Sequence, residues 1–211
     1  MHESDTAPSN TFQRFAAIVA KSLHVEASRI TPDSHLEDLG AESLDLIEIT
    51  MDTETEFGIS MPEKSILQSA QEVFGPGVLE KDGVVTAEGK KLLRARMPEP
   101  EMDAQLLEGE LTVKQLNRVF SKLSTWVRLI EGLQKLTPAT CAQCGGELAA
   151  PVALRMKCKQ CGAETDLPSG EDQNKAWVTE YYQKVYLPSG VAPAPGPADS
   201  NSQTEAVARQ Q

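Results

Sequence analysis

The chain has 211 residues, of which 40% are hydrophobic and 24% charged, and its formal net charge is −11 at pH 7. This length suffices for one modest domain with appendages. The negative charge disfavours nucleic acid or an anionic membrane as the main partner, and no apolar run approaches the length that spans a bilayer. Residues 1–66 hold 13 acidic and 4 basic side chains, a net −9, so the acidity is concentrated there.

The N-terminal segment, residues 1–10, is polar, and we expect it to be a flexible tail. It lacks the apolar core of a secretory signal, so we expect a cytoplasmic protein. A first helix is predicted by apolar residues that recur at helical spacing: Phe12, Phe15, Ala16, Val19 and Leu23. Residues 24–42 are expected to form a long loop that contributes Ile30 and Leu36 to the core.

A second helix is predicted from Leu44 to the residue before Gly58, because neither Gly nor Pro interrupts this stretch. Gly40 fits a tight turn before it, which places Ser43 at or next to the helix N-cap. One face of this helix is an acidic stripe: Asp45, Glu48, Asp52 and Glu56. An apolar edge lies beside the stripe: Leu44, Ile47 and Met51.

Ser43 is the candidate functional residue of this helix. A helix N-terminus presents unpaired N–H groups and partial positive charge, so it accommodates a phosphate. An isolated serine at this position is usually only a helix cap. The glycine turn, the helix head and the acidic stripe occur together here, and this combination favours attachment of a mobile group to the Ser43 hydroxyl.

Residues 11–66, with a further match at 111–123, resemble the acyl carrier protein family. In that family the serine of an Asp-Ser-Leu motif carries 4′-phosphopantetheine. Ser43, Leu44 and Asp45 match the motif, whereas Glu42 replaces its aspartate and keeps the charge. The resemblance implies a mainly α, four-helix bundle and a phosphoprotein that is not an enzyme. A transferase would add the arm from coenzyme A, and the thiol of the arm would hold acyl groups as thioesters.

The resemblance also implies partners, and the concentrated acidic face suits transient docking to basic patches on partner enzymes. The partners would be the phosphopantetheinyl transferase and the enzymes that load and process acyl groups in fatty-acid, polyketide or related biosynthesis, and the negative charge argues against nucleic acid. The expected docking residues are Glu42, Leu44, Asp45, Glu48, Met51, Asp52 and Glu56. Thr50 and Thr53 replace larger apolar residues that face the acyl pocket in many relatives. Two alternatives stay open: an aminoacyl or peptidyl carrier, and an adaptor whose carrier-like fold bears no cargo and acts through the metal module described below.

We place the carrier domain at residues 11–136, with an insertion at about 67–109 before the last helix. The insertion contains a turn at Asp82-Gly83 and a short helix from Thr86 to Arg96. Thr112 is expected to cap the last helix, which the apolar spacing extends without interruption to about Leu136. This is longer than the family needs, so the excess would form a stalk for the next module.

Two Cys-x-x-Cys-Gly turns contain all the cysteines of the chain: Cys141, Cys144, Cys158 and Cys161. Two such turns complete a tetrahedral site of four thiolates, so residues 137–168 are predicted to form a small β zinc ribbon, similar to rubredoxin. Iron fits the same geometry. With four protein ligands the site is closed and therefore structural. Disulfides would need an oxidising compartment, which nothing in the sequence indicates.

Residues 169–187 are expected to form a short helix whose Trp177, Tyr181 and Tyr182 pack on the ribbon or the stalk. Residues 188–211 are rich in Pro, Ala, Gly, Ser and Gln, and we expect a disordered tail.

Overall fold

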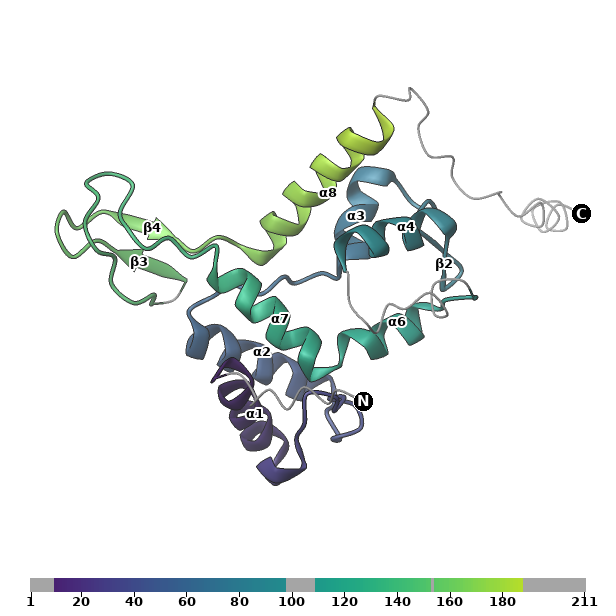
Figure 1. Ribbon diagram of the computed structural model, residues 1–211, viewed down its shortest axis with the longest axis horizontal. Coiled ribbons are helices and arrows are strands. Elements are labelled where there is room, and N and C mark those ends of the chain that lie inside the picture. Colours follow the sequence, from purple (N-terminus) through teal and green to yellow (C-terminus); the bar gives the residue numbers. More distant parts are fainter. Residues whose placement is uncertain (1–9, 98–108, 153, 188–211) are drawn as a thin grey trace, which may run out of the picture. The chain divides into compact units, whose positions relative to one another are not determined.

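The computed structural model describes residues 10–97, 109–152 and 154–187 (Figure 1). The expected tails at 1–10 and 188–211 lie outside the described residues, except for Asn10. The described part is mainly helical with two small sheets, which confirms the predicted fold class. The chain divides into two compact units, one from residues 1–65 and 114–176, the other from 66–113 and 177–211.

The first unit is organised around helix α1 (Asn10–Leu23), which packs against α2 (Ser43–Phe57) and α7 (Leu123–Gln134). The ring of Phe15 is fully buried and stacks on Trp126 of α7, with 5.3 Å between ring centroids. The predicted apolar positions of the first helix therefore do face the core. The other buried members of this core are Phe12, Ala16, Ile18, Val19, Ile30, Leu36, Ile49, Phe57, Ile59, Met61, Leu123, Val127, Ile130 and Leu133.

The loop between α1 and α2 contains one short 3-10 helix, η1 (Ala27–Arg29), and the two apolar anchors expected of it. Ile30 and Leu36 are both buried in the core. Two ion pairs also attach this loop to the segment before α7: Asp33 with Lys122 at 2.8 Å, and Asp38 with Arg118 at 2.8 Å. The hydrogen bond from Arg118 lowers the pKa of the Asp38 carboxyl.

The prediction of one continuous helix from residue 112 to 136 is wrong. The segment forms α6 (Val113–Phe120) and α7, separated by Ser121 and Lys122. Lys122 is extended, with ψ of 134°, and the loop supplies hydrogen bonds at the break: Leu36 N donates to Ser121 O, and Leu123 N donates to Ser34 O, both at 3.0 Å. The apolar spacing continues through the break, so periodicity alone does not reveal it. The part of this segment that lines the carrier core is α7, so α7 is not a stalk.

The second unit begins with α3 (Ile66–Phe74), a helix that is not among the elements predicted from the sequence. Strands β1 (Glu80–Lys81) and β2 (Val84–Val85) then form a hairpin. The turn predicted at Asp82-Gly83 connects them, with φ angles of +52° and +80°. Helix α4 (Ala87–Arg96) follows, and the Thr86 hydroxyl caps it by accepting from Gly89 N at 3.1 Å. The predicted short helix is thus confirmed.

Helix α8 (Gly170–Tyr186) contains the boundary between the two units, at residue 176. Its aromatic residues do not pack as expected on the ribbon or a stalk. Tyr182 and Tyr186 meet the ring of Phe74 of α3 edge-on, at 4.9 and 5.5 Å between centroids. Trp177 stacks on Tyr181 and lies under the Arg96 guanidinium of α4. The aromatic part of α8, from Trp177 onward, therefore belongs to the second unit, although it follows the ribbon in sequence.

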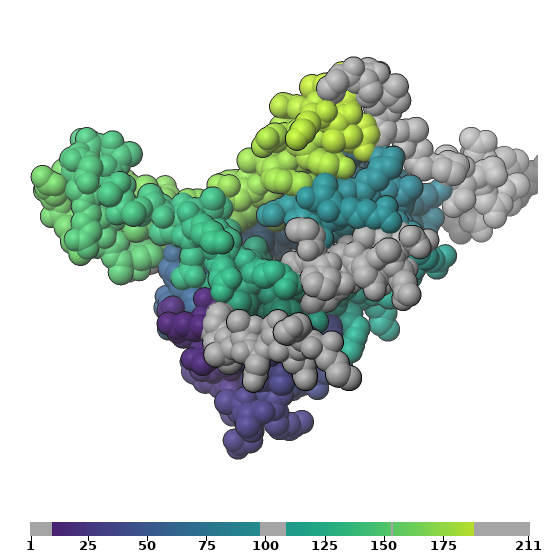
Figure 2. All heavy atoms as spheres, viewed as in Figure 1, coloured from purple at the N-terminus to yellow at the C-terminus, as the bar shows by residue number. Residues whose placement is uncertain are grey.

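The cysteine segment folds around an antiparallel sheet of β3 (Arg155–Lys157) and β4 (Glu164–Asp166). Figure 2 shows the atoms of this module, in green, gathered into one lobe. Its apolar interior is small and includes two of the cysteines: Cys141, Leu148, Met156, Cys158 and Leu167. So small an interior contributes little hydrophobic stabilisation, which suits a module held together by a metal.

Candidate functional site

Ser43 is the first residue of α2, and its side chain is exposed. The turn before it depends on Gly40, whose φ of +94° is unfavourable for residues with a Cβ. The cap of the helix is Glu42 rather than Ser43. The Glu42 side chain accepts from the backbone of Asp45, and Glu42 N donates to Asp45 Oδ2 at 2.7 Å. Within the described part of the chain, the Ser43 hydroxyl has no hydrogen-bond partner.

This geometry excludes the simplest structural role for Ser43, which is to cap the helix. A serine that caps a helix is bound to backbone N–H groups and is unavailable for modification. Here the carboxylates of Glu42 and Asp45 satisfy the reciprocal capping box, so the serine hydroxyl is left to solvent. Ser43 lies at the helix head, as its sequence predicts, whereas the acidic cap, which replaces the usual Ser/Thr and Glu pair, is an additional feature of the structure.

The acidic stripe of α2 is divided by its contacts with α1. Lys21 lies 2.9 Å from Asp52, and Arg14 lies 2.8 Å from Glu56 and also covers the Phe57 ring. The hydrogen bond with Asp52 raises the pKa of Lys21. Glu48, by contrast, is exposed and forms no hydrogen bond or ion pair with other described residues. The net negative charge of the stripe is therefore concentrated toward Ser43.

The apolar edge of α2 faces solvent. Leu44, Ile47 and Met51 are 79%, 56% and 61% exposed, whereas Ile49 and Thr53 on the opposite face are completely buried. The Thr53 hydroxyl donates to Ile49 O at 2.6 Å, and Thr50 donates to Leu46 O in the same way. These bonds satisfy the threonine hydroxyls within the helix, so the threonines place little polar character in the core.

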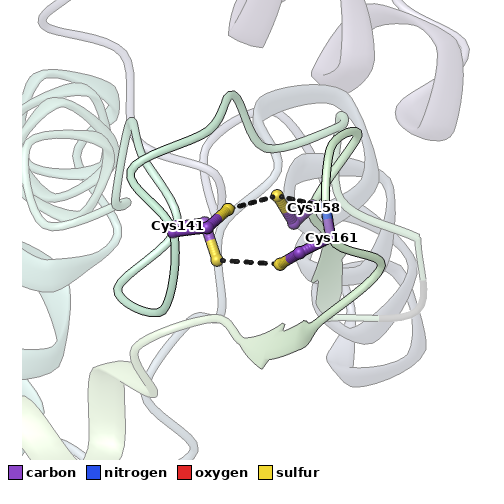
Figure 3. Close-up of side chains that lie close together, drawn as sticks. Cys141, Cys158 and Cys161 are labelled. Carbon is purple, nitrogen blue, oxygen red and sulfur yellow. Dashed lines mark hydrogen bonds between the residues drawn. The ribbon is translucent and has the colours of Figure 1, made fainter.

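The second candidate site is formed by the four cysteines, whose sulfur atoms all lie within 4.8 Å of one another. Figure 3 shows the labelled side chains of Cys141, Cys158 and Cys161 directed toward a common centre. The Sγ atoms of Cys141 and Cys161 are 3.8 Å apart, and those of Cys144 and Cys158 are 3.5 Å apart. Four sulfurs at the usual zinc–sulfur length of about 2.3 Å from a tetrahedral centre lie about 3.8 Å apart. The cluster therefore fits a zinc ion.

The two cysteine turns have the same backbone geometry. In the first, Gly145 N donates to Cys141 O and Cys141 N donates to Gly146 O, and in the second, Gly162 N donates to Cys158 O and Cys158 N donates to Ala163 O. Gly145 and Gly162 have φ of +72° and +74°, which explains the glycine after each pair.

Backbone N–H groups point at the sulfur atoms of this cluster. Those of Cys161 and Gln160 lower the pKa of Cys158 to about 6. The Gly146 N–H lowers the pKa of Cys144. Hydrogen bonds with Cys161 and Cys158 raise it, and the net result is a pKa of about 12. A bound metal ion would hold all four as thiolates.

Comparison with known proteins identifies the class of protein to which the segment around Ser43 belongs. The family model described as "Phosphopantetheine attachment site" matches residues 13–72, which include Ser43 and its helix. The matched segment thus belongs to a class of proteins that carry a covalent arm rather than catalyse a reaction.

Similarity to individual proteins shows which family within this class the chain belongs to. An acyl carrier protein of Zymomonas mobilis is 44% identical over 59 residues, which are 28% of this chain and 76% of the relative. Acyl carrier proteins of two Helicobacter pylori strains are 39% identical over 54 residues (G27) and 34% over 71 residues (26695), covering 69% and 86% of those relatives. The chain belongs to the acyl carrier protein family. These alignments cover only a quarter to a third of the chain. Among the described residues, no helix is long and apolar enough to cross a membrane.

Proposed function

We propose that Ser43 carries 4′-phosphopantetheine and that the protein presents acyl groups, held as thioesters on this arm, to biosynthetic enzymes. The observation that carries the proposal is the exposed Ser43 hydroxyl, which lies at a helix head already capped by Glu42. A phosphodiester at this position leaves the cap and the core undisturbed. When bound, the arm supplies the thiol that forms the thioester. The residues of this chain fix one end of the arm on a rigid helix and leave the rest mobile.

The nature of the cargo can be tested on protein purified from the cells that produce it. We expect intact-mass measurement to show the arm together with an acyl group, and neutral hydroxylamine to remove the acyl group, because hydroxylamine cleaves thioesters. The mass of the released hydroxamate separates an acyl group from an amino acid. An aminoacyl hydroxamate would replace the acyl assignment by the aminoacyl carrier alternative, and an arm-free protein would support the adaptor.

We also propose that the head of α2 docks these enzymes through its acidic residues Glu42, Asp45 and Glu48 and its apolar residues Leu44 and Met51. Asp52 and Glu56, which are also among the predicted docking residues, contribute less net charge because Lys21 and Arg14 pair with them. Charge of this kind speeds the encounter with a basic partner more than it strengthens the complex.

The docking surface predicts a charge-dependent rate. Glu48→Lys should slow the modification of Ser43 by a phosphopantetheinyl transferase roughly fivefold at low salt, and added salt should reduce the difference, because ions screen exposed charges. The matched control is Glu26→Lys, an exposed acid at the N-cap of η1 whose side chain makes no capping bond. Equal rates for the wild type and Glu48→Lys at every salt concentration would contradict the docking role.

We propose further that the four cysteines bind one zinc ion with a structural role. The site has four protein ligands and no open position, so it offers no place for a substrate or a reactive water. A reduced four-cysteine cluster and a free arm thiol both suit a reducing compartment, which supports placing the protein in the cytoplasm.

A further inference from the structure

The exposed apolar edge of α2 forms a straight row along the helix. Leu44, Ile47 and Met51 are spaced by three and four residues, and the same spacing continues through Thr55 to Gly58, the C-cap. The row starts next to Ser43 and ends about 21 Å away, from the helical rise of about 1.5 Å per residue. A partner that lies along this edge therefore reaches the C-terminal end of α2.

At this end the row meets the cysteine module. A Cβ built on Gly58 would lie 2.7 Å from Pro151 Cγ, so Pro151 packs directly on the helix terminus. After Pro151, two backbone hydrogen bonds join Val152 and Arg155: Val152 N donates to Arg155 O at 2.7 Å, and Arg155 N donates to Val152 O at 3.0 Å. Val152 is 77% exposed and Leu154 is 42% exposed. The apolar row thus continues onto the ribbon.

A second contact fixes the ribbon at the same end of α2. Gly170 N, just after the ribbon, donates to Ser60 O at 3.0 Å, and Ser60 and Ser169 form a bridge. The approach is so close that a Cβ on Gly170 would lie 2.6 Å from Ser60 O. The chain therefore contacts the C-terminal end of α2 on both sides of the exposed ribbon segment, at Pro151 before it and at Gly170 after it.

The charges along this surface change from one end to the other. Near Ser43 the surface carries the negative charge of Glu42, Asp45 and Glu48. On the ribbon, Arg155 pairs with Asp166 at 2.9 Å, and Lys159 pairs with Glu147. The surface is accordingly acidic and apolar at the Ser43 end, and apolar with balanced charge at the ribbon end.

We propose that the ribbon turn formed by Pro151, Val152 and Leu154 is the second half of the docking surface of this carrier. One enzyme that loads or removes the acyl group contacts the row on α2 and the ribbon turn together, with a basic patch over the head of α2 and an apolar patch over the ribbon. A length of about 21 Å fits within an ordinary interface of about 800 Å² per partner. This inference rests on the proposed docking role of α2. The ribbon would then select enzymes specific to this carrier.

The test places a photoreactive side chain at position 51 or at position 152 of the full-length protein in the cells that produce it. We expect an acyl-thioester enzyme to be crosslinked from both positions, and Met51→Glu to reduce the crosslink from position 152 at least fivefold. The matched control position is Gln143, an exposed ribbon residue in the first cysteine turn. No protein shared by positions 51 and 152, or a crosslink from 152 that is insensitive to Met51→Glu, would overturn the proposal.

A kinetic measurement with the enzyme that the crosslinks identify, prepared in its free form, completes the test. Val152→Asp should lower kcat/KM for loading or removing the acyl group about tenfold, because it places a charge in an apolar contact. Modification of Ser43 by a broad-specificity transferase shows that the variant is folded and that the carrier site is intact. If the transferase does not modify the wild-type protein, the proposed function of Ser43 is refuted. If the transferase modifies it and Val152→Asp leaves kcat/KM unchanged, the ribbon contact alone is refuted.

Discussion

Incubation with coenzyme A, magnesium and a broad-specificity phosphopantetheinyl transferase should add one phosphopantetheine to the wild-type protein and none to Ser43→Ala. The hydroxyl is exposed and is not used as a helix cap, so the transferase can reach it without unfolding α2. For the same reason, Ser43→Ala should leave the free energy of unfolding within about 0.5 kcal/mol of the wild type. Intact-mass spectrometry and urea unfolding measure the two effects.

The matched control is Ser28→Ala, a substitution of another exposed serine in a short helical segment, η1. It should be modified as fully as the wild type. An unmodified wild type, under conditions that modify an ordinary carrier protein, would favour the adaptor alternative. A loss of more than about 1 kcal/mol in Ser43→Ala would show that the hydroxyl does cap the helix.

Removal of the metal should unfold the cysteine module and leave the helical core folded. Structural zinc contributes about 10–16 kcal/mol to small domains, and the ribbon interior has five buried side chains, two of which are the proposed ligands Cys141 and Cys158. A strong chelator, or Cys158→Ser, should therefore remove one metal ion per chain and abolish the dispersed NMR signals of β3 and β4. Signals from Phe15 and Trp126 in the α1–α7 contact should remain, because that core contains no cysteine.

Elemental analysis gives the metal content and distinguishes zinc from iron. Gln143→Ala lies between the two cysteines of the first turn, supplies no ligand and should retain the metal. Protein prepared under reducing conditions that contains no metal, yet keeps a folded ribbon, would contradict the assignment. Two disulfides in place of the metal would contradict it as well.

The sequence was sufficient for the parts of the fold that depend on local chemistry. The head and the end of α2 follow from Gly40 and Gly58, whose φ angles of +94° and +61° have the positive sign that the turns require. The cysteine spacing likewise predicts the cluster of sulfur atoms, since each turn is built from its own residues.

What the sequence could not predict depends on contacts between distant segments. The break at Ser121 and Lys122 requires hydrogen bonds from residues 34–36, more than 80 positions away. Likewise, Tyr182 packs on Phe74 only because the chain returns after the ribbon. The acidic cap at Glu42 was in principle predictable, since Asp45 follows it at capping-box spacing.

The division of the chain into two units has a consequence for the order in which the protein folds. The chain passes from one unit to the other at residues 65–66, 113–114 and 176–177. The carrier core needs α7, so it cannot close until the ribosome has synthesised the whole insertion, and the insertion in turn obtains the rings of α8 only at the end of synthesis. Contacts between such distant segments slow folding. An expression fragment that ends after α2 would expose Phe15 and Ile49 to solvent and should aggregate, even though it contains Ser43 and its complete motif.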